Sequence, residues 1–303
     1  YEVFEDMDAA LAYLETAPVP TVVKADGLAL GKGVIIAETR DEARAAVRSM
    51  MEDKVFGASG ARIVIEEFLT GPEVSVLSFT DGNVVVPMVS SMDHKRAGDG
   101  DTGLNTGGMG TVAPNPYYTP EIADLCMKTI FVPTIEAMKK EGRLFRGCLY
   151  FGLMLTPAGP RVIEYNCRFG DPETQVVLPL LESDLLTVMM ATAEGRLSEV
   201  PVKFSDKSAC CVIIASKGYP VKYESGCPLM LPTDGEDGFI YVAGAKKTES
   251  GLVSAGGRVL GVTATADSLR EAVDAAYAKA AKVKFDNGFY RKDIGARALA
   301  AKK

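Results

Sequence analysis

Two oxygen ligands and an arginine alternate along residues 162–173, a segment typical of a β-strand and its end. Strand alternation would put Glu164, Asn166 and Arg168 on one face, with two hard oxygen ligands beside a guanidinium. Magnesium typically takes one or two carboxylates together with phosphate oxygens and water, so this face suits a magnesium ion and a transferring phosphoryl group. A surface strand end with mixed charges is the weaker explanation, because the intervening residues are mostly apolar. Further candidate carboxylates follow at Asp171 and Glu173.

A glycine-rich loop between two short β-branched segments has the composition of an anion-binding turn. It resembles a Walker A loop, but its spacing is one residue short and no Ser or Thr follows the lysine, so that interpretation fails. Glycines let backbone N–H groups approach an anion, and a lysine at each end would neutralise it. A plain hairpin with solvated lysines explains this loop alone equally well. The candidate residues are Lys24, Gly27, Gly31, Lys32 and Gly33.

A predicted strand at residues 62–68 carries the adjacent acids Glu66 and Glu67. Neighbouring residues of a strand point to opposite faces, so one carboxylate should face inward unless the strand lies at an edge. An inward carboxylate needs a donor, which a purine amino group or a ribose hydroxyl would supply. For this segment taken alone, an ion pair with a neighbouring Lys or Arg is the favoured explanation.

Residues 90–111 form a long predicted loop rich in Gly, Asp, Asn and Thr. A loop of this length inside a compact domain is usually functional or disordered, and we expect a functional one. Its basic residues and main-chain N–H groups suit a carboxylate or a phosphate. An exposed mobile loop is the alternative. His94 is interpreted as a structural histidine rather than a catalytic base.

Composition and charge exclude several classes of protein. The 303 residues, at 32.2 kDa, carry 33 Lys and Arg against 40 Asp and Glu, a formal net charge of −7. This acidic balance argues against nucleic acid or an anionic membrane surface as a partner. The most apolar stretch, residues 176–193, is interrupted by Glu182 and Asp184, so we expect no membrane-spanning segment.

The cysteines and the single histidine restrict the chemistry further. The six cysteines form no C-x-x-C pair and follow no signal peptide, so we expect reduced, buried thiols, a cytoplasmic location and no zinc site. One histidine leaves little room for Ser-His-Asp or Cys-His catalysis. The chain begins at Tyr1 without an initiator Met, and we expect a fragment of a longer protein.

Periodicity and turn signals predict the elements that position these residues. Strands flank the glycine loop, and Thr39 with Glu42 would cap the helix that follows. The region after Pro201 should form a small α+β unit of its own. The other predicted elements are strands at 62–68, 73–79, 83–89, 149–155, 161–166, 209–215, 238–243 and 257–263, and helices at 121–141, at 185–193 and from 268, the last capped by Ser268 with Glu271.

The lysine strand, the glycine loop, the IVIEEFL segment and the E-x-N strand end together resemble the nucleotide site of ATP-grasp enzymes, in which ATP lies between two α+β lobes. Longer segments resemble the phosphoribosylamine–glycine ligase family over nearly the whole chain, and RFGDPE is the most discriminating of them. The segments are DHKRAGDGDTGLNTGGMG (93–110), EYNCRFGDPETQ (164–175), GGRVLGVTA (256–264) and YRKDIG (290–295).

The resemblance implies an α+β fold: a two-lobed ATP-grasp fold followed by a small C-terminal α+β domain. Residues 1–70 would form the lid lobe, 71–196 the main lobe with the metal site, and 197–303 the C-terminal domain. It also implies a reaction of purine biosynthesis. ATP would activate glycine as glycyl phosphate, and 5-phosphoribosylamine would displace phosphate to give glycinamide ribonucleotide. Mg²⁺ would be the metal cofactor, with Mn²⁺ as the alternative.

Site roles follow by resemblance. Glu164 and Asn166 would bind the metal, and Arg168 would be the catalytic residue that steadies the transferring phosphoryl group. ATP would be bound by Lys24, Gly27, Gly31, Lys32, Gly33, Glu66, Phe68, Leu69 and Glu73. Glycine or phosphoribosylamine would be enclosed by Asp93, Lys95, Arg96, Asn105 and Gly108.

Two departures from the family pattern qualify the prediction. Many ATP-grasp enzymes carry another acid on the strand before Glu164, whereas residues 149–153 contain none, which leaves a second metal site unsupported. Family members also begin with an N-terminal α/β domain that this chain lacks, so we expect nucleotide binding without product. The alternatives are another ATP-grasp carboxylate–amine ligase, which RFGDPE and YRKDIG disfavour, and a non-catalytic nucleotide-binding module.

Overall fold

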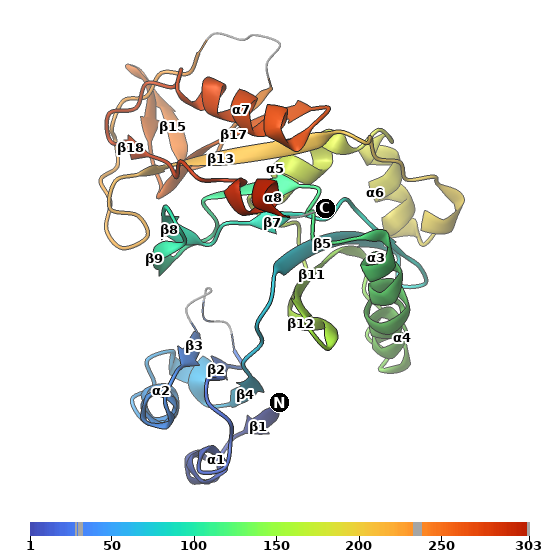
Figure 1. The fold of residues 1–303 in the computed structure, drawn as a ribbon, viewed down its shortest axis with the longest axis vertical. Coiled ribbons are helices and arrows are strands. Elements are labelled where there is room, and N and C mark those ends of the chain that lie inside the picture. The colour runs from blue at the N-terminus through green and yellow to red at the C-terminus, as the bar shows by residue number, and fades with distance from the viewer. Residues whose placement is uncertain (28, 30–32, 233–237, 302–303) are drawn as a thin grey trace. The chain divides into compact units, whose positions relative to one another are not determined.

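The computed structural model describes residues 1–27, 29, 33–232 and 238–301. Two predicted site residues, Gly31 and Lys32, lie outside this range. The chain divides into two compact units, Tyr1–Thr70 and Gly71–Lys303 (Figure 1). The first of these has the same bounds as the predicted lid lobe.

The first unit is a four-stranded antiparallel sheet, in the order β1-β4-β2-β3, with two helices packed on it. Alternation puts Val23, Ile63 and Ile65 into the core beneath the helices, and leaves Lys24 and Glu66 on the opposite face. The strands are β1 (Glu2–Phe4), β2 (Thr21–Ala25), β3 (Val34–Ala37) and β4 (Ile63–Glu67).

Of the two helices of this unit, the second begins where the sequence predicts a cap. Thr39 and Glu42 form the expected capping box of the second helix, in which each side chain bonds the other's backbone N–H. Asp6 caps the first helix by accepting a hydrogen bond from the N–H of Ala9. The elements are α1 (Met7–Leu14), α2 (Arg40–Met51) and a 3₁₀ turn, η1 (Gly57–Gly60).

The smaller sheet of the second unit has the order β12-β11-β5-β6 and is antiparallel throughout. One face packs on a helical segment, where the Phe131 and Phe151 rings lie 4.2 Å apart between centroids. The predicted helix at 121–141 is confirmed, with a π-helical turn in its middle. The elements are β5 (Glu73–Thr80), β6 (Val85–Pro87), β11 (Gly147–Thr156), β12 (Gly159–Asn166), α3 (Pro120–Cys126), η2 (Met127–Phe131) and α4 (Val132–Lys140).

The larger sheet runs β14-β17-β13-β10-β7, with β18 paired to β13. Its central strand β13 is buried on both faces: Cys211 and Ile213 face the side of α5, while Cys210 and Val212 face α7. Ser268 forms the predicted capping box of α7. The elements are β7 (Met92–Asp93), β10 (Gly110–Ala113), β13 (Ser208–Ser216), β14 (Phe239–Val242), β17 (Arg258–Ala266), β18 (Gly288–Phe289), α5 (Thr174–Val177) and α7 (Leu269–Ala280).

This sheet joins strands from both sides of the predicted boundary at residue 196. Strand β10 pairs antiparallel with β13, so the segment before the boundary supplies part of the sheet that the C-terminal segment completes. The division into three domains therefore stays a prediction. What the pairing does establish is that the loop around Gly110 is fixed by the C-terminal strands.

The stretch predicted as a loop, residues 90–111, is more regular than expected. It contains β7, the hairpin β8–β9 and the start of β10, because its glycines form tight turns between strands too short to give a periodic pattern. The remaining elements are β8 (Arg96–Gly98), β9 (Thr102–Asn105), β15 (Ala245–Thr248), β16 (Gly251–Ser254), η3 (Leu178–Leu180), α6 (Leu185–Glu194), η4 (Leu197–Glu199) and α8 (Ala296–Ala300).

All six cysteines are free thiols, and four of them are buried. Cys167 is exposed, contrary to the prediction of buried thiols, because it alternates with Asn166 and Arg168 at a strand end open to solvent. Over the described part of the chain, no helix has the length and apolar character needed to cross a membrane.

Candidate active site

Three strands of the smaller sheet place polar groups on the face opposite the helices. The register sets Ser75 on β5, Gly152 on β11 and Glu164 on β12 in one row across the sheet. The next row brings Tyr150 opposite Asn166. Because side chains alternate along each strand, all of these groups point to the same side.

Glu164, Asn166 and Arg168 lie together as the alternation predicts. The Asn166 amide nitrogen donates to the Glu164 carboxylate at 3.4 Å, and the Arg168 guanidinium donates to Asn166 Oδ1 at 3.3 Å. Glu164 and Arg168 are exposed, so a ligand in solvent can reach them. The geometry agrees with the prediction, while the roles of these residues stay predictions.

Gly152 lies opposite Glu164, on the strand where many ATP-grasp enzymes carry another acid. A Cβ at this position would lie 2.9 Å from Glu164 Cγ and 3.4 Å from the Tyr150 ring, so a larger residue there would have to displace the Glu164 side chain. The space that a second acidic residue would need is therefore taken by the Glu164 side chain itself. This row of the sheet holds one carboxylate.

A group of carboxylates lies around Tyr150 and Lys95. The Tyr150 hydroxyl is 2.6 Å from Ser75 Oγ and donates to Glu173 Oε1 at 3.1 Å. Lys95 forms an ion pair with Glu73, with 2.7 Å between Nζ and Oε2. Burial together with the charges of Glu173, Asp93 and Glu164 raises the pKa of Tyr150, so its hydroxyl stays protonated and serves as a donor.

Two of these carboxyls, Asp93 and Glu173, are costly to ionise. Burial and the nearby charge of Glu173 raise the pKa of Asp93 well above its usual range, and burial raises the pKa of Glu173. Burial would lower the pKa of Lys95, but the charges of Glu73, Glu164 and Asp93 outweigh it and raise that pKa. The ionised forms of these two carboxyls are thus disfavoured, and Lys95 is a nearby cation that partly offsets this cost.

The other predicted substrate residues divide into two groups. Gly108 adjoins the carboxylate group: its φ is +107°, and a Cβ there would lie 2.6 Å from Asp93 Oδ1. Gly108 therefore leaves room for the Asp93 carboxylate and the Pro172 ring. Arg96 and Asn105 instead face each other across the exposed β8–β9 hairpin, where Arg96 donates to the Gly103 carbonyl at 2.8 Å.

Two of the predicted nucleotide residues, Lys24 and Glu66, lie on the face of the first unit's sheet that is opposite its helices. Lys24 forms an ion pair with Glu66 at 2.5 Å, as the simpler explanation of that carboxylate expects. Val34 and Ile36 on the same face remain half exposed. Phe68 and Leu69, directly after β4, are partly buried. Gly27 has a steric role, because a Cβ there would lie 2.5 Å from Ser59 Cα.

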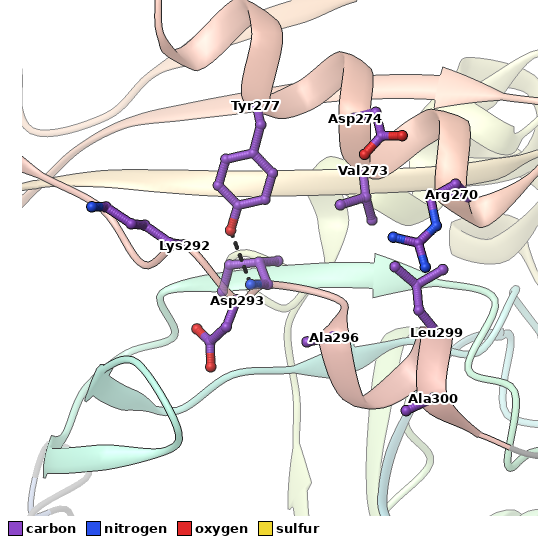
Figure 2. Close-up of a pocket in the computed structure, with 10 residues that line it drawn as sticks. Arg270, Val273, Asp274, Tyr277, Lys292, Asp293, Ala296, Leu299 and Ala300 are labelled. Carbon is purple, nitrogen blue, oxygen red and sulfur yellow. Dashed lines mark hydrogen bonds between the residues drawn. The ribbon is translucent and has the colours of Figure 1, made fainter.

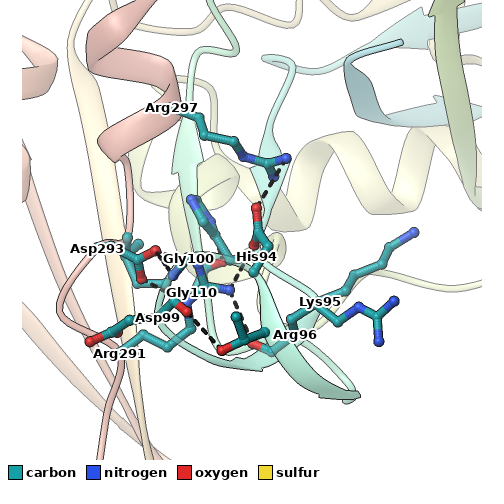
Figure 3. A network of polar contacts seen from close by, with 12 residues as sticks. His94, Lys95, Arg96, Asp99, Gly100, Gly110, Arg291, Asp293 and Arg297 are labelled. Carbon is teal, nitrogen blue, oxygen red and sulfur yellow. Dashed lines mark hydrogen bonds and ion pairs between the residues drawn. The ribbon is translucent and has the colours of Figure 1, made fainter. Parts of the chain in front are cut away.

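His94 is a structural histidine, as predicted. Its ring accepts a hydrogen bond from the Gly295 N–H at Nε2 (3.1 Å), so Nδ1 carries the proton and donates to the Gly110 carbonyl at 3.1 Å. Nearby, buried Arg291 binds both Asp293 oxygens and the Arg96 carbonyl (Figure 3). These contacts attach the 93–110 segment to the YRKDIG segment.

A separate cavity of about 390 Å³ lies between α7 and the C-terminal residues (Figure 2). It is lined by Arg270, Asp274, Tyr277 and Lys292, among others. Within the described residues, none of the predicted site residues lines it. The candidate site is therefore the face of the smaller sheet that carries Tyr150 and Glu164, and not this cavity.

Tyr150, Ser75 and Arg258 were not predicted from the sequence as site residues. Tyr150 and Ser75 lie in mostly apolar strands, and only the strand register reveals that they share one face, where the Tyr150 hydroxyl contacts both Ser75 and Glu173. The sequence signal that could have revealed them is a tyrosine and a serine at strand positions whose side chains point to the same face of the sheet.

We predict that His94 titrates far below an ordinary histidine. Burial lowers the pKa of its imidazole to about 4, against about 6.5 in an unfolded chain. Stability should therefore fall as the pH drops from 6.5 towards 4, because the unfolded chain takes up the proton first. As the chain has one histidine, a single imidazole NMR resonance reports this directly. A midpoint near 6.5 in the folded protein would contradict the assignment.

Comparison with known proteins identifies the family. The family model for the ATP-grasp (A) domain of phosphoribosylglycinamide synthetase matches residues 1–174, and the model for its C domain matches residues 209–297. The phosphoribosylamine–glycine ligase of Halalkalibacterium halodurans is 49% identical over 99% of this chain and 70% of its own length. That of Pasteurella multocida is 46% identical over 100% of this chain and 71% of its own length.

Solved structures agree with this assignment. The crystal structure of the Thermotoga maritima phosphoribosylamine–glycine ligase superposes with a TM-score of 0.89 at 36% identity, covering 97% of this chain and 73% of that one. A biotin carboxylase domain from Hydrogenobacter thermophilus, 15% identical with a TM-score of 0.72 over 95% of this chain and 62% of its own, shares the fold alone. The predicted α+β fold, ATP-grasp followed by a small C-terminal domain, is confirmed, and the chain belongs to the phosphoribosylamine–glycine ligase family.

Proposed function

We propose that the protein to which this chain belongs joins glycine to 5-phosphoribosylamine at the expense of ATP, and that the face of β5, β11 and β12 that carries Glu164 is where the phosphoryl group is transferred. The observation that carries the proposal is the placement of Glu164, Asn166 and Arg168 beside the carboxylate group around Tyr150. One side of the sheet thus offers oxygen ligands for a cation, a guanidinium for a phosphoryl group, and buried carboxyls for an ammonium. Family membership favours this reaction over that of another ATP-grasp ligase.

The residues present fit a magnesium ion. Glu164 and Asn166 supply two oxygen ligands on one accessible face, which is the number Mg²⁺ usually takes from a protein before phosphate oxygens and water complete its shell. Among the described residues, no cluster of three or more His, Cys, Asp or Glu side chains could hold a metal alone. Bound there, the ion would neutralise phosphate charge; Mn²⁺ suits the same ligands.

The nucleotide would bind on the exposed sheet face of the first unit. Half-exposed Val34 and Ile36 on β3 offer an apolar surface to adenine, and partly buried Phe68 and Leu69 follow β4, on the other side of β2. Lys24 would contact the phosphates, with Glu66 as its neighbour. Glu73, proposed for the ribose, is bound to Lys95 in the structure and would have to exchange that partner for the ribose hydroxyls.

Asp93 and Glu173 would receive the ammonium group of glycine. Both carboxyls have raised pKa values because of burial, and a bound cation would offset that cost. An ammonium held there leaves the glycine carboxylate free to approach the phosphoryl group. Arg96 and Asn105 on the β8–β9 hairpin are then left for phosphoribosylamine.

The chemistry consists of two displacements. The glycine carboxylate attacks the γ-phosphorus of ATP, the bond to the β-phosphate oxygen breaks, and glycyl phosphate and ADP form. The amine of phosphoribosylamine then attacks the glycyl carbonyl, the C–O bond to phosphate breaks, and the amine loses a proton. Arg168 stabilises the charge on the transferring phosphoryl group, and the protein contributes mainly positioning and neutralisation.

We place this reaction in the cytoplasm, because six free thiols suit a reducing compartment. The ligands are ATP, glycine and phosphoribosylamine, and neither nucleic acid nor a membrane is proposed as a partner. The acidic net charge of −7 argues against binding to nucleic acid or to an anionic membrane surface.

We predict that Mg-ATP raises the melting temperature and that Glu164→Ala with Asn166→Ala removes the magnesium-dependent part. A ligand at a hundredfold excess over its Kd stabilises by about 2.7 kcal/mol, which thermal unfolding detects readily. Melting curves with ATP plus Mg²⁺, and with ATP plus a chelator, separate the two contributions. Glu199→Ala, an exposed carboxylate elsewhere, is the control. An unchanged magnesium response in the double variant would refute the metal assignment.

We predict that the full-length protein to which this chain belongs consumes ATP only when glycine and phosphoribosylamine are both supplied. Formation of ADP and phosphate would be followed while each substrate is omitted in turn or replaced by another amine acceptor. Comparable turnover with a different acceptor would favour another ATP-grasp ligase activity.

We predict that Asp93→Asn raises the KM for glycine without changing the KM for ATP. Losing a charged hydrogen-bond acceptor costs about 1.5–3 kcal/mol, which corresponds to a rise of about 10- to 100-fold. Initial rates at varied glycine and at varied ATP measure the two constants, and exposed Asp124→Asn serves as the control. Equal rises in both constants would argue that Asp93 only supports the fold.

A further inference from the structure

Arg258, the first residue of β17, connects two segments of the candidate site that are far apart in the sequence. Its guanidinium donates to the carbonyls of Gly107 at 2.6 Å and Asp171 at 2.9 Å. It also forms an ion pair with the Asp171 carboxylate at 3.0 Å. About four-fifths of the side chain is buried. None of these contacts involves the helices or the apolar core, so they serve the site segments themselves.

The backbone beside Arg258 is shaped to fit it. A Cβ at Gly107 would lie 2.9 Å from the centre of the guanidinium. On the next residue, a Cβ at Gly108 would lie 2.5 Å from Pro172 Cδ and 2.6 Å from Asp93 Oδ1. The two glycines are thus enclosed by Arg258, Pro172 and Asp93, and a larger residue at either position would force these groups apart.

The two connected segments carry the buried carboxyls. Gly108 touches Asp93, while Asp171 lies two residues before Glu173, which Tyr150 holds through its hydroxyl. The charge of Glu173 raises the pKa of Asp93, so bringing the two together is unfavourable without a bound cation. Hydrogen bonds that join the Gly107–Gly108 turn to the Asp171–Pro172 segment oppose this repulsion. Arg258 supplies these hydrogen bonds from β17, and its planar guanidinium donates to both segments at once in a geometry that a lysine does not reproduce.

We propose that Arg258 is a positioning residue for catalysis: it holds the Gly107–Gly108 turn against the Asp171–Pro172 segment, so that Asp93 and Glu173 stay side by side for the amino group of glycine. The inference rests on the proposed function, because it assigns Arg258 to the geometry of the glycine subsite. Arg258 itself touches neither reacting group; it acts through the two segments that it connects.

The test compares Arg258→Ala, Arg258→Lys and Gly107→Ala with Arg196→Ala, a partly exposed arginine that pairs only with surface carboxylates. Gly107→Ala reaches the same contact from the other side, because its new methyl group displaces the guanidinium. We expect kcat/KM for glycine to fall about 100-fold in Arg258→Ala and Gly107→Ala, as for a misplacement of about 1 Å, with the KM for ATP unchanged. Arg258→Lys should lie between these variants and the wild type.

Recovery of activity on addition of guanidinium ion is a measurement that distinguishes positioning from a merely structural role. At millimolar concentration guanidinium should restore part of the activity of Arg258→Ala, where it can occupy the vacated space, but not that of Gly107→Ala. Circular dichroism and melting curves check that each variant folds. If Arg258→Ala fails to fold, Gly107→Ala and Arg258→Lys still test the inference. In these variants kcat/KM for glycine should fall while the KM for ATP stays unchanged.

The outcomes separate the inference from the function on which it rests. A full-length wild-type protein that consumes no ATP in the presence of glycine and phosphoribosylamine overturns the proposed function, and this inference with it. An active wild type with an unchanged glycine constant in Arg258→Ala and Gly107→Ala overturns the inference alone. The inference is also overturned if the variants lose activity with an equal change in the KM for ATP, in proportion to their loss of melting temperature, and without recovery on addition of guanidinium.

Discussion

The proximity of two carboxyl groups, the partly buried Asp93 and the buried Glu173, is the constraint on which the arrangement of the second unit depends. Burial penalises the charge on each, and the charge of Glu173 adds to the penalty on Asp93. A folded protein keeps two such carboxyls close together only if the hydrogen bonds and ion pairs around them outweigh the free-energy cost of burying and juxtaposing their charges. Here the Tyr150 hydroxyl, which donates to Glu173, the His94 N–H, which donates to Asp93, and the Arg258 contacts supply those bonds from three different strands and their ends.

The larger sheet matters to the site because it fixes segments that have little structure of their own. Strand β10 is held by β13, and β17 follows on the other side of β13. This order puts Arg258 within reach of the glycine turn, although the two are about 150 residues apart. The C-terminal strands therefore do more than extend the fold, since they set the position of residues in the candidate active site.

Local patterns in the sequence predicted the parts of the site that depend on one strand or one helix end. Alternation placed Glu164, Asn166 and Arg168 on one face, and the capping boxes at Thr39 and Ser268 marked two helix starts. Contacts between distant segments could not be predicted in this way. Tyr150 meets Glu173 only through the strand register, and Arg258 gives no local signal of its three main-chain and side-chain partners. The glycines at 107 and 108 indicated a turn, but the groups that require them lie elsewhere in the chain.

The single histidine shows how little acid–base chemistry this reaction asks of the protein. A carboxylate is already ionised at neutral pH, so the first displacement needs no general base, and its barrier depends on bringing two anions together. The demand is for cations and hydrogen-bond donors placed around those anions, which Arg168 and a metal at Glu164 and Asn166 would meet. His94 is accordingly free to serve the structure, where its neutral ring both donates and accepts one hydrogen bond. A neutral ring also adds no positive charge beside the carboxyls that would bind the ammonium of glycine, so it does not compete with that substrate.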